Sequence, residues 1–121
     1  MQPPIKYLDY ISKEDLPAII SGAKLLTLPA LYEGFGIPAL EAMASGVPTV
    51  VSNLSSLPEV VGDAGVLVDP TSVDSIAGGL LKVLTDSNLR EQMIVKGLER
   101  AKMFTWENTA KKTLEVIESL K

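Results

Sequence analysis

The stretch from Pro29 to Pro48 constrains the fold of this chain more than any other part of the sequence. It follows a short apolar run over residues 25–28, of the kind that forms a buried parallel strand. Gly34 and Gly36 then mark a loop in which the backbone can approach a ligand closely. The stretch therefore predicts a strand, a glycine loop and a helix that begins at the end of the loop.

The helix predicted after this loop is apolar on every face apart from one carboxylate. Pro38 suits its first turn, where the missing N–H is not needed, and Gly46 followed by Pro48 ends it. A helix of this composition is expected to be buried, yet it carries Glu41. Because helical side chains lean toward the N-terminus, we expect Glu41 to lean toward the loop that holds Glu33.

Two carboxylates and a free helix N-terminus are thus predicted to meet at the carboxyl end of a parallel strand. Ligands of open α/β sheets bind at that edge. The helix N-terminus favours phosphate, and a carboxylate beside it suits the hydroxyls of a ribose or a sugar. The residues alone therefore predict a site for a ligand that carries both phosphate and hydroxyl groups.

The run from Glu33 to Glu41 resembles the Glu-x₇-Glu motif of retaining glycosyltransferases with the GT-B fold. The surrounding chain resembles the C-terminal, donor-binding domain of the family called glycosyl transferases group 1. Residues 57–64, 68–70 and 104–106 also fall where that family has similar residues. The resemblance implies a transferase that moves a sugar from a nucleotide-diphosphate-sugar donor to an acceptor hydroxyl.

The resemblance also implies roles for single residues of the motif. In the family, the first glutamate approaches the hydroxyls of the donor sugar, and the second holds the ribose of the nucleotide. We therefore expect the donor-sugar-binding residues to be Glu33, Gly34, Phe35 and Gly36. We expect the nucleotide-binding residues to be Ile37 and Glu41. We expect no cofactor and no metal, and the resemblance assigns no catalytic residue within this chain.

Two other functions match parts of the pattern. Residues 34–39 fit the G-x-G-x-x-A form of the dinucleotide fingerprint. That site needs its glycines directly after the strand and an acid at the end of the next strand, whereas residues 30–33 intervene in this chain and the next strand ends in Ser52-Asn53. Paired carboxylates also serve glycoside hydrolases, where both flank the scissile bond in an open cleft. A carboxylate on a helix expected to be buried suits binding better than acid catalysis.

Strands alternate with helices along the chain, which predicts a parallel α/β sheet with helices on both faces. About four strands are expected, at residues 5–11, 25–28, 49–51 and 65–68. Helices are expected after a capping box at Ser12 and Asp15, over residues 55–61 and after residue 71, and a helical segment over about 88–121 ends the chain. Trp106 is expected to anchor the last helix in the core. Residues 1–121 are thus predicted to form one partial, Rossmann-like domain.

Charge and composition exclude several classes of partner. The chain has 11 basic and 15 acidic residues, a net charge of −4 and no basic cluster, which argues against nucleic acid. It has no cysteine and no histidine, which excludes a disulfide framework and a thiolate metal site. No secretory signal and no apolar run of membrane-spanning length are visible. We therefore expect a cytoplasmic protein, with peripheral membrane attachment of the parent enzyme left open.

The resemblance further implies that this chain is a fragment. The family's catalytic unit has two Rossmann-like domains, and the N-terminal one, which holds the acceptor, has no counterpart in this sequence. The first two strands of the C-terminal domain, with the cations that pair with the donor diphosphate, are also missing. We expect an inactive chain that binds nucleotide-diphosphate sugar weakly or not at all. The alternative is a non-catalytic α/β half-domain, and uncovered strand edges and apolar faces predict a homo-oligomer.

Overall fold

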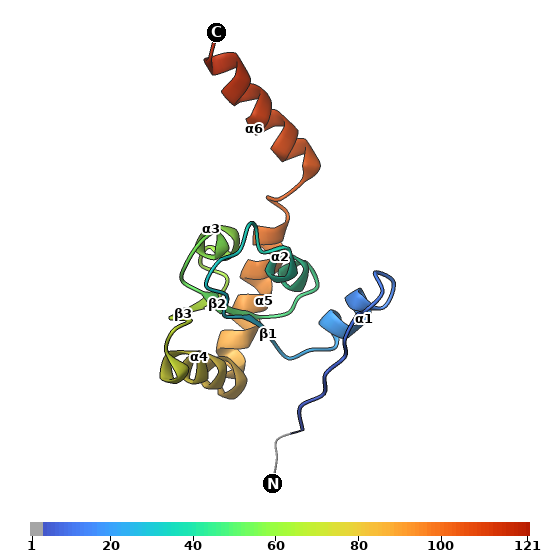
Figure 1. The fold of residues 1–121 in the computed structure, drawn as a ribbon, viewed down its shortest axis with the longest axis vertical. Helices are drawn as coiled ribbons and strands as arrows, with labels where there is room; N and C mark the ends of the chain where they lie inside the picture. The colour runs from blue at the N-terminus through green and yellow to red at the C-terminus, as the bar shows by residue number, and fades with distance from the viewer. Residues whose placement is uncertain (1–3) are drawn as a thin grey trace.

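The computed structural model describes residues 4–121, which form six helices and one sheet of three parallel strands (Figure 1). In chain order the elements are α1 (Leu16–Ser21), β1 (Leu26–Leu28), α2 (Ile37–Ala44), β2 (Thr49–Ser52), α3 (Leu57–Val61), β3 (Val66–Val68), α4 (Val73–Thr85), α5 (Ser87–Ala101) and α6 (Trp106–Ser119). The alternation of strands and helices confirms the predicted α/β class. The strand order β1-β2-β3 follows the order of the strands in the sequence.

The middle strand, β2, is the centre of the molecule. It pairs in parallel with β1, where Thr27 lies opposite Val50, and with β3, where Val50 lies opposite Val66. All four residues of β2 are buried. A strand that is covered on both faces needs a continuous apolar or β-branched run, which Thr49-Val-Val supplies. Because the strands are parallel, the loops that leave their carboxyl ends emerge at one common edge.

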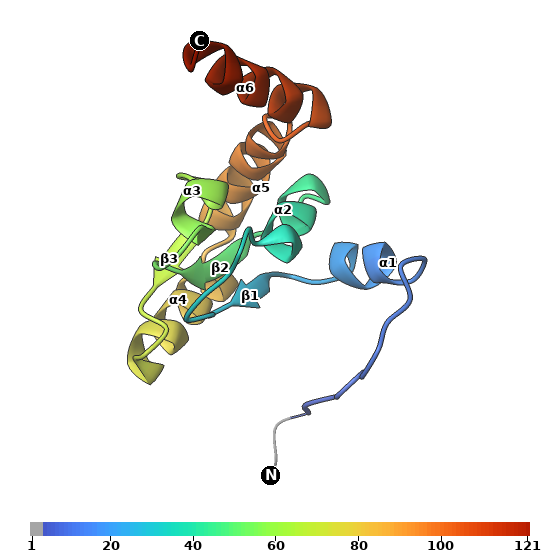
Figure 2. The same ribbon diagram turned by 45° about the horizontal axis from the view of Figure 1, so that its top comes forward.

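Helices cover both faces of the sheet, as predicted (Figure 2). Helices α2 and α3 cover the face that carries Val51, and α4 covers the face that carries Val50. Helix α4 approaches the sheet so closely that a Cβ built on Gly79 would lie 2.5 Å from Val68 Cγ1. Helix α5 contacts both α2 and α4, and its Gly97 packs on Met43 of α2. The core therefore lies mainly in two apolar layers, one on each face of β2, and a smaller buried cluster joins α1 to α2 through Ile20 and Ala42.

The prediction of a strand over residues 5–11 is wrong. These residues form no strand, and β1 occupies the edge of the sheet within the part of the chain that the structure describes. The side chain of Tyr7 is 87% exposed, and those of Ile5 and Tyr10 are similarly open to solvent. The pattern of a strand is present, but a strand forms only where another strand accepts its backbone hydrogen bonds. The described sheet therefore has three strands rather than about four.

The first helix begins slightly later than its capping box. Ser12 Oγ donates to Asp15 Oδ2 at 2.9 Å, and the Asp15 N–H donates to Ser12 Oγ at 3.2 Å. The box closes a turn over residues 12–15, and α1 follows from Leu16. The predicted bond from the Asp15 N–H to Ser12 is confirmed, but Asp15 and not Ser12 is the N-cap of α1, and the Asp15 carboxylate accepts from the Ser12 hydroxyl rather than from the Ser12 N–H.

The last helix forms at the predicted residues, but it does not pack against the core as predicted. The Asn108 N–H donates to Thr105 Oγ1 at 3.0 Å, so Thr105 caps the helix, as a threonine before a helical pattern predicts. Helix α6 has no buried residue, and Figure 1 shows it projecting beyond the end of α5. Trp106 is 88% exposed, so its predicted role as a core anchor is wrong. Capping and an amphipathic pattern are local signals, and they determine the helix without determining what it packs against.

Candidate functional site

The predicted site lies where the loops after β1 and β2 meet. The first loop spans residues 29–36 and holds Glu33, and the second spans residues 53–56 and holds Ser55 and Ser56. Both loops leave the carboxyl edge of the sheet, which is where ligands of open α/β sheets bind. Hydrogen bonds between residues 22 or 23 positions apart in the sequence join the two loops. The carboxyl edge predicted from the sequence therefore consists of two loops that are hydrogen-bonded to each other.

The two serines hold the main chain of the first loop. The Glu33 N–H donates to Ser55 Oγ at 2.9 Å, and the Ser55 hydroxyl donates back to the Glu33 carbonyl. Ser56 Oγ lies 2.9 Å from the carbonyl oxygens of both Glu33 and Phe35. The sequence placed these serines at the start of the helix expected over residues 55–61, but Ser56, the N-cap residue of α3, makes no side-chain cap bond there. The only sign of this contact in the sequence is that two serines follow the strand that pairs with β1.

The two glycines of the loop differ in whether the fold requires glycine at their positions. Gly36 is buried and has φ +99°, a conformation that favours glycine, and a Cβ there would lie 2.7 Å from Leu57 Cδ2. The same Cβ would lie 3.9 Å from Glu33 Cγ, so the glutamate side chain passes beside Gly36. Gly34 has no described atom within 4 Å of its Cβ position. The fold therefore requires glycine at position 36, while position 34 faces open space.

Free backbone N–H groups line the start of α2. The N–H groups of Ala39 and Leu40 both donate to the Gly36 carbonyl, at 3.0 and 3.2 Å, and Pro38 has no N–H. The N–H groups of residues 34–37 bond to no atom of residues 4–121. The N-terminal end of a helix also carries the positive end of its dipole. These amides can therefore donate to an anion or to sugar oxygens.

The two glutamates of the motif differ in burial. Glu33 is half-buried in the loop, whereas Glu41 is exposed on α2. Ile37 is also exposed, and it lies one turn before Glu41 on the same face of the helix. The expectation that α2 is buried on every face is wrong, because only the side of Ala39, Ala42 and Met43 meets the rest of the fold. Glu41 is therefore available to a ligand from solvent.

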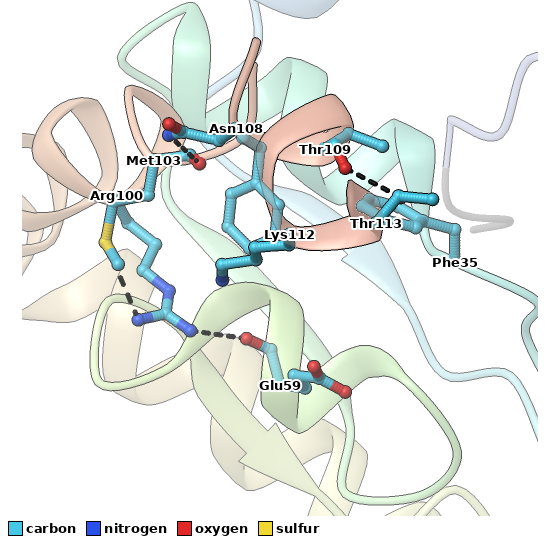
Figure 3. A pocket seen from close by; sticks show the side chains of 9 residues that line it. Phe35, Glu59, Arg100, Met103, Asn108, Thr109, Lys112 and Thr113 are labelled. Carbon is cyan, nitrogen blue, oxygen red and sulfur yellow. Dashed lines mark hydrogen bonds between the residues drawn. The ribbon is translucent and has the colours of Figure 1, made fainter. Parts of the chain in front are cut away.

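A cleft of about 290 Å³ lies beside this loop, between α3, the end of α5 and the start of α6 (Figure 3). Phe35 is the one predicted site residue that lines it, and its ring meets Phe104 edge-on with centroids 5.9 Å apart. The Arg100 guanidinium lies 5.6 Å from the Phe104 ring centroid. Its Nε donates to the Val60 carbonyl at 3.1 Å, and a second nitrogen donates to the Glu59 carbonyl. Arg100 thereby ties the last turn of α3 to α5.

Other polar residues at strand ends serve local turns. Ser52 is buried, and its Oγ accepts the Leu54 N–H at 3.0 Å. Asp69 Oδ1 accepts the Thr71 hydroxyl at 2.6 Å and the Thr71 N–H at 2.9 Å. The hydroxyl bond, followed by the N–H bond, lowers the pKa of Asp69 below its ordinary value of 3.8. These contacts account for both residues without a ligand.

The described residues offer neither a metal site nor a membrane-spanning helix. Within residues 4–121, no group of three or more acidic side chains is placed so that it could hold a metal ion. None of the helices in that range is long and apolar enough to cross a membrane.

Comparison with known proteins gives the family. Residues 2–100 match the family described as glycosyl transferases group 1. The chain is 48% identical over 116 residues to the O-antigen chain mannosyltransferase B of Escherichia coli, a match that covers 96% of this chain and 30% of that protein. It is 40% identical over 112 residues to the MMP alpha-(1->4)-mannosyltransferase of Mycolicibacterium hassiacum, covering 89% of this chain and 27% of that protein. The chain thus spans less than a third of the length of these curated relatives.

Solved structures agree with this result. Sucrose-phosphate synthase from Thermosynechococcus elongatus superposes with a TM-score of 0.82 at 30% identity, over 95% of this chain and 30% of that one. The C-terminal domain of a group 1 family protein from Francisella tularensis superposes with a TM-score of 0.69 at 30% identity, over 82% and 51%. The fold is therefore a Rossmann-like domain of the GT-B type. The chain belongs to the glycosyl transferases group 1 family, which confirms the resemblance found in its sequence.

Proposed function

We propose that this chain is the donor-binding part of a retaining glycosyltransferase. The whole protein transfers a sugar from a nucleotide-diphosphate-sugar donor to an acceptor hydroxyl. Family membership supports the reaction class. The observation that carries the proposal is the open space over Gly34, in a loop whose N–H groups at residues 34–37 bond to no atom of residues 4–121. A loop that is otherwise bound to its neighbours leaves this one side open.

Each residue of the motif takes one role in this proposal. The carboxylate of Glu33 accepts hydrogen bonds from hydroxyls of the donor sugar, and the amides of Gly34, Phe35 and Gly36 donate to the sugar end of the donor. The Ile37 amide, at the positive end of α2, donates to the diphosphate. The exposed carboxylate of Glu41 accepts hydrogen bonds from the ribose hydroxyls. Negative charge that develops on the departing diphosphate is stabilised by these amides.

We further propose that the transferred sugar is mannose. The E. coli and M. hassiacum relatives are both mannosyltransferases, and they match about nine-tenths or more of this chain. The word mannosyltransferase, which both names share, describes the sugar that is transferred and not the acceptor. The acceptor is bound by parts of the transferase other than this chain.

Substitution of the two glutamates tests these roles in the full-length transferase. Replacing Glu41 by alanine removes a charge-assisted hydrogen bond of about 1.5–3 kcal/mol, so affinity for the bare nucleoside diphosphate should fall roughly tenfold to hundredfold. Glu33→Ala should keep that affinity and depress sugar transfer. Glu118→Ala on α6 is the matched control, because Glu118 is exposed and remote from the loop in sequence. Calorimetry that finds equal nucleotide affinity in the wild type and Glu41→Ala refutes the assignment.

The isolated chain is proposed to transfer no sugar. Stabilisation of the departing diphosphate is usually the largest catalytic contribution. The amides of the loop supply only partial charges, and no lysine or arginine occurs between residues 25 and 81. The cations that pair with the diphosphate would then come from elsewhere in the transferase. Turnover of a nucleotide-diphosphate mannose by the purified chain, above that of Glu33→Gln, would contradict this.

A second function is favoured by the exposed apolar side chains at both ends of the chain. Residues 4–11 expose Ile5, α6 and the residue after it expose Trp106 and Leu120, and β1 is one edge of the described sheet. We propose that the isolated chain associates with a second copy through these surfaces. Light scattering coupled to size exclusion tests this, and a monomeric mass over a wide range of concentration rules it out.

A further inference from the structure

The hydroxyls of Ser55 and Ser56 make bonds that the fold of α3 does not explain. Ser55 has φ +60°, a backbone conformation that is strained for any residue other than glycine. Ser56 stands at the N-cap position of α3, yet its hydroxyl lies against the first loop and not against the helix. Both side chains therefore serve the loop that carries Glu33.

None of these bonds involves a fully buried residue. Ser55, Gly34 and Phe35 are exposed and Glu33 and Ser56 are half-buried, so water can reach part of this segment. An exposed carbonyl loses little when a protein donor is exchanged for water. What the two hydroxyls add is a fixed direction for the main chain between Glu33 and Phe35.

The direction of the carbonyls decides where the amides of this loop point. The described chain contains no cis peptide bond, and a trans peptide directs its N–H opposite to its C=O. The Glu33 carbonyl faces both serines, so the Gly34 N–H faces away from them. The Phe35 carbonyl faces Ser56, so the Gly36 N–H also faces away. Neither N–H bonds to any atom of residues 4–121, in agreement with this orientation.

We propose that Ser55 and Ser56 are positioning residues of the donor site. By holding the carbonyls of Glu33 and Phe35, they aim the N–H groups of Gly34 and Gly36 at the sugar end of the donor. The proposal rests on the proposed function for the identity of the ligand. The serines themselves do not touch the donor in it, so their effect falls on sugar transfer and not on affinity for the bare nucleotide.

The test uses the double variant Ser55→Gly with Ser56→Ala. Glycine suits the left-handed backbone at position 55, so this change removes the hydroxyl without adding strain. Ser21→Ala is the matched control, because the Ser21 hydroxyl donates only within α1, to the Pro17 carbonyl at 2.8 Å and the Ala18 carbonyl at 3.3 Å. Ser56→Thr keeps the hydroxyl and serves as the conservative variant.

Two readouts are expected to change together. In the 121-residue chain, hydrogen exchange of the Glu33 amide, followed by NMR, should accelerate in the double variant and stay unchanged in Ser21→Ala. In the full-length transferase, kcat should fall roughly tenfold to hundredfold, the size expected when reacting groups are misplaced. Affinity for the bare nucleoside diphosphate and the urea midpoint of unfolding should remain at wild-type values. Ser56→Thr should retain most of the wild-type kcat.

The outcomes separate this proposal from the one on which it rests. A wild-type kcat in the double variant overturns the positioning role, and so does a fall in kcat that is matched by equal falls in nucleotide affinity and stability. If the wild-type transferase binds no nucleoside diphosphate, the proposed function fails and the serines lose their positioning role with it. Accelerated exchange of the Glu33 amide would in that case still show that the two serines join the two loops.

Discussion

The middle of the chain and its two ends carry similar apolar patterns with opposite results. Val50, Val51 and Leu57 in the middle are completely buried. Tyr7 near the N-terminus and Trp106 at the start of α6 are almost completely exposed. Figure 1 shows the same contrast, because the N-terminal segment and α6 extend from opposite ends of a packed body. An apolar pattern therefore shows that a face can be buried, and burial depends on whether this chain supplies the partner.

The middle of the chain buries its apolar residues because its own strands and helices pack around β2. Strands β1 and β3 pair with its two edges, and helices cover both of its faces. The loop that carries Glu33 belongs to this packed part, since Gly36 touches Leu57 and the serines that follow β2 bind the loop. The candidate site is thus built on the part of the chain that buries its apolar residues.

The largest expected difference between the two regions is in the loss of stability when a leucine is truncated to alanine. Leu57→Ala empties a completely buried position and should lower the free energy of unfolding by about 2–5 kcal/mol. Leu120→Ala changes a side chain that is 81% exposed and should shift it by less than about 0.5 kcal/mol. Urea unfolding of the 121-residue chain measures both. Equal losses at the two positions would show that the C-terminal end of α6 is packed as firmly as the core.

A smaller effect is expected within the loop itself, between its two glycines. Gly36→Ala combines a left-handed backbone with a close approach to Leu57 and should cost about 1–3 kcal/mol. Gly34→Ala meets open space and should leave stability unchanged or raise it by up to about 1 kcal/mol. In the full-length transferase it should nevertheless weaken sugar transfer, because its methyl group occupies the space proposed for the donor. Undiminished transfer by Gly34→Ala would move the donor away from this loop.

The smallest expected effect concerns the exposed turn at Asp69. Thr71→Val removes the hydroxyl bond that contributes most to the lowered pKa of Asp69, so that pKa should rise toward 3.8. Because the folded pKa of the wild type is lowered, its advantage in stability is present above the unfolded pKa and is lost as the pH falls through the folded value. NMR titration of the Asp69 carboxyl group measures the change. Identical titration curves in both proteins would contradict the assigned cause.

Local signals in the sequence predicted most elements of the fold. The turn at Ser12 and Asp15, the first turn of α2 with Pro38 and the cap at Thr105 all depend on residues within one turn of each other. The strand over residues 5–11 and the burial of Trp106 depend on a partner elsewhere. Periodicity carries no information about that partner, and both predictions were wrong for this reason.

The same distinction applies to the candidate site. Glu33, Gly36 and Glu41 lie in one short motif, so the sequence brings them to attention together. The contact between Glu33 and Ser55 joins residues 22 positions apart through the pairing of two strands, and no local pattern encodes it. Exposure of Glu41 likewise depends on which side of α2 meets its neighbours, which composition alone did not reveal.

Hydrogen–deuterium exchange of the full-length transferase, with and without a nucleotide-diphosphate mannose, tests the central claim most directly. If residues 33–41 form the donor site, the peptide that covers them should gain protection when the donor binds. The peptide that covers α4, on the opposite face of the sheet, should change little. Protection that appears elsewhere while residues 33–41 exchange at an unchanged rate would contradict the account.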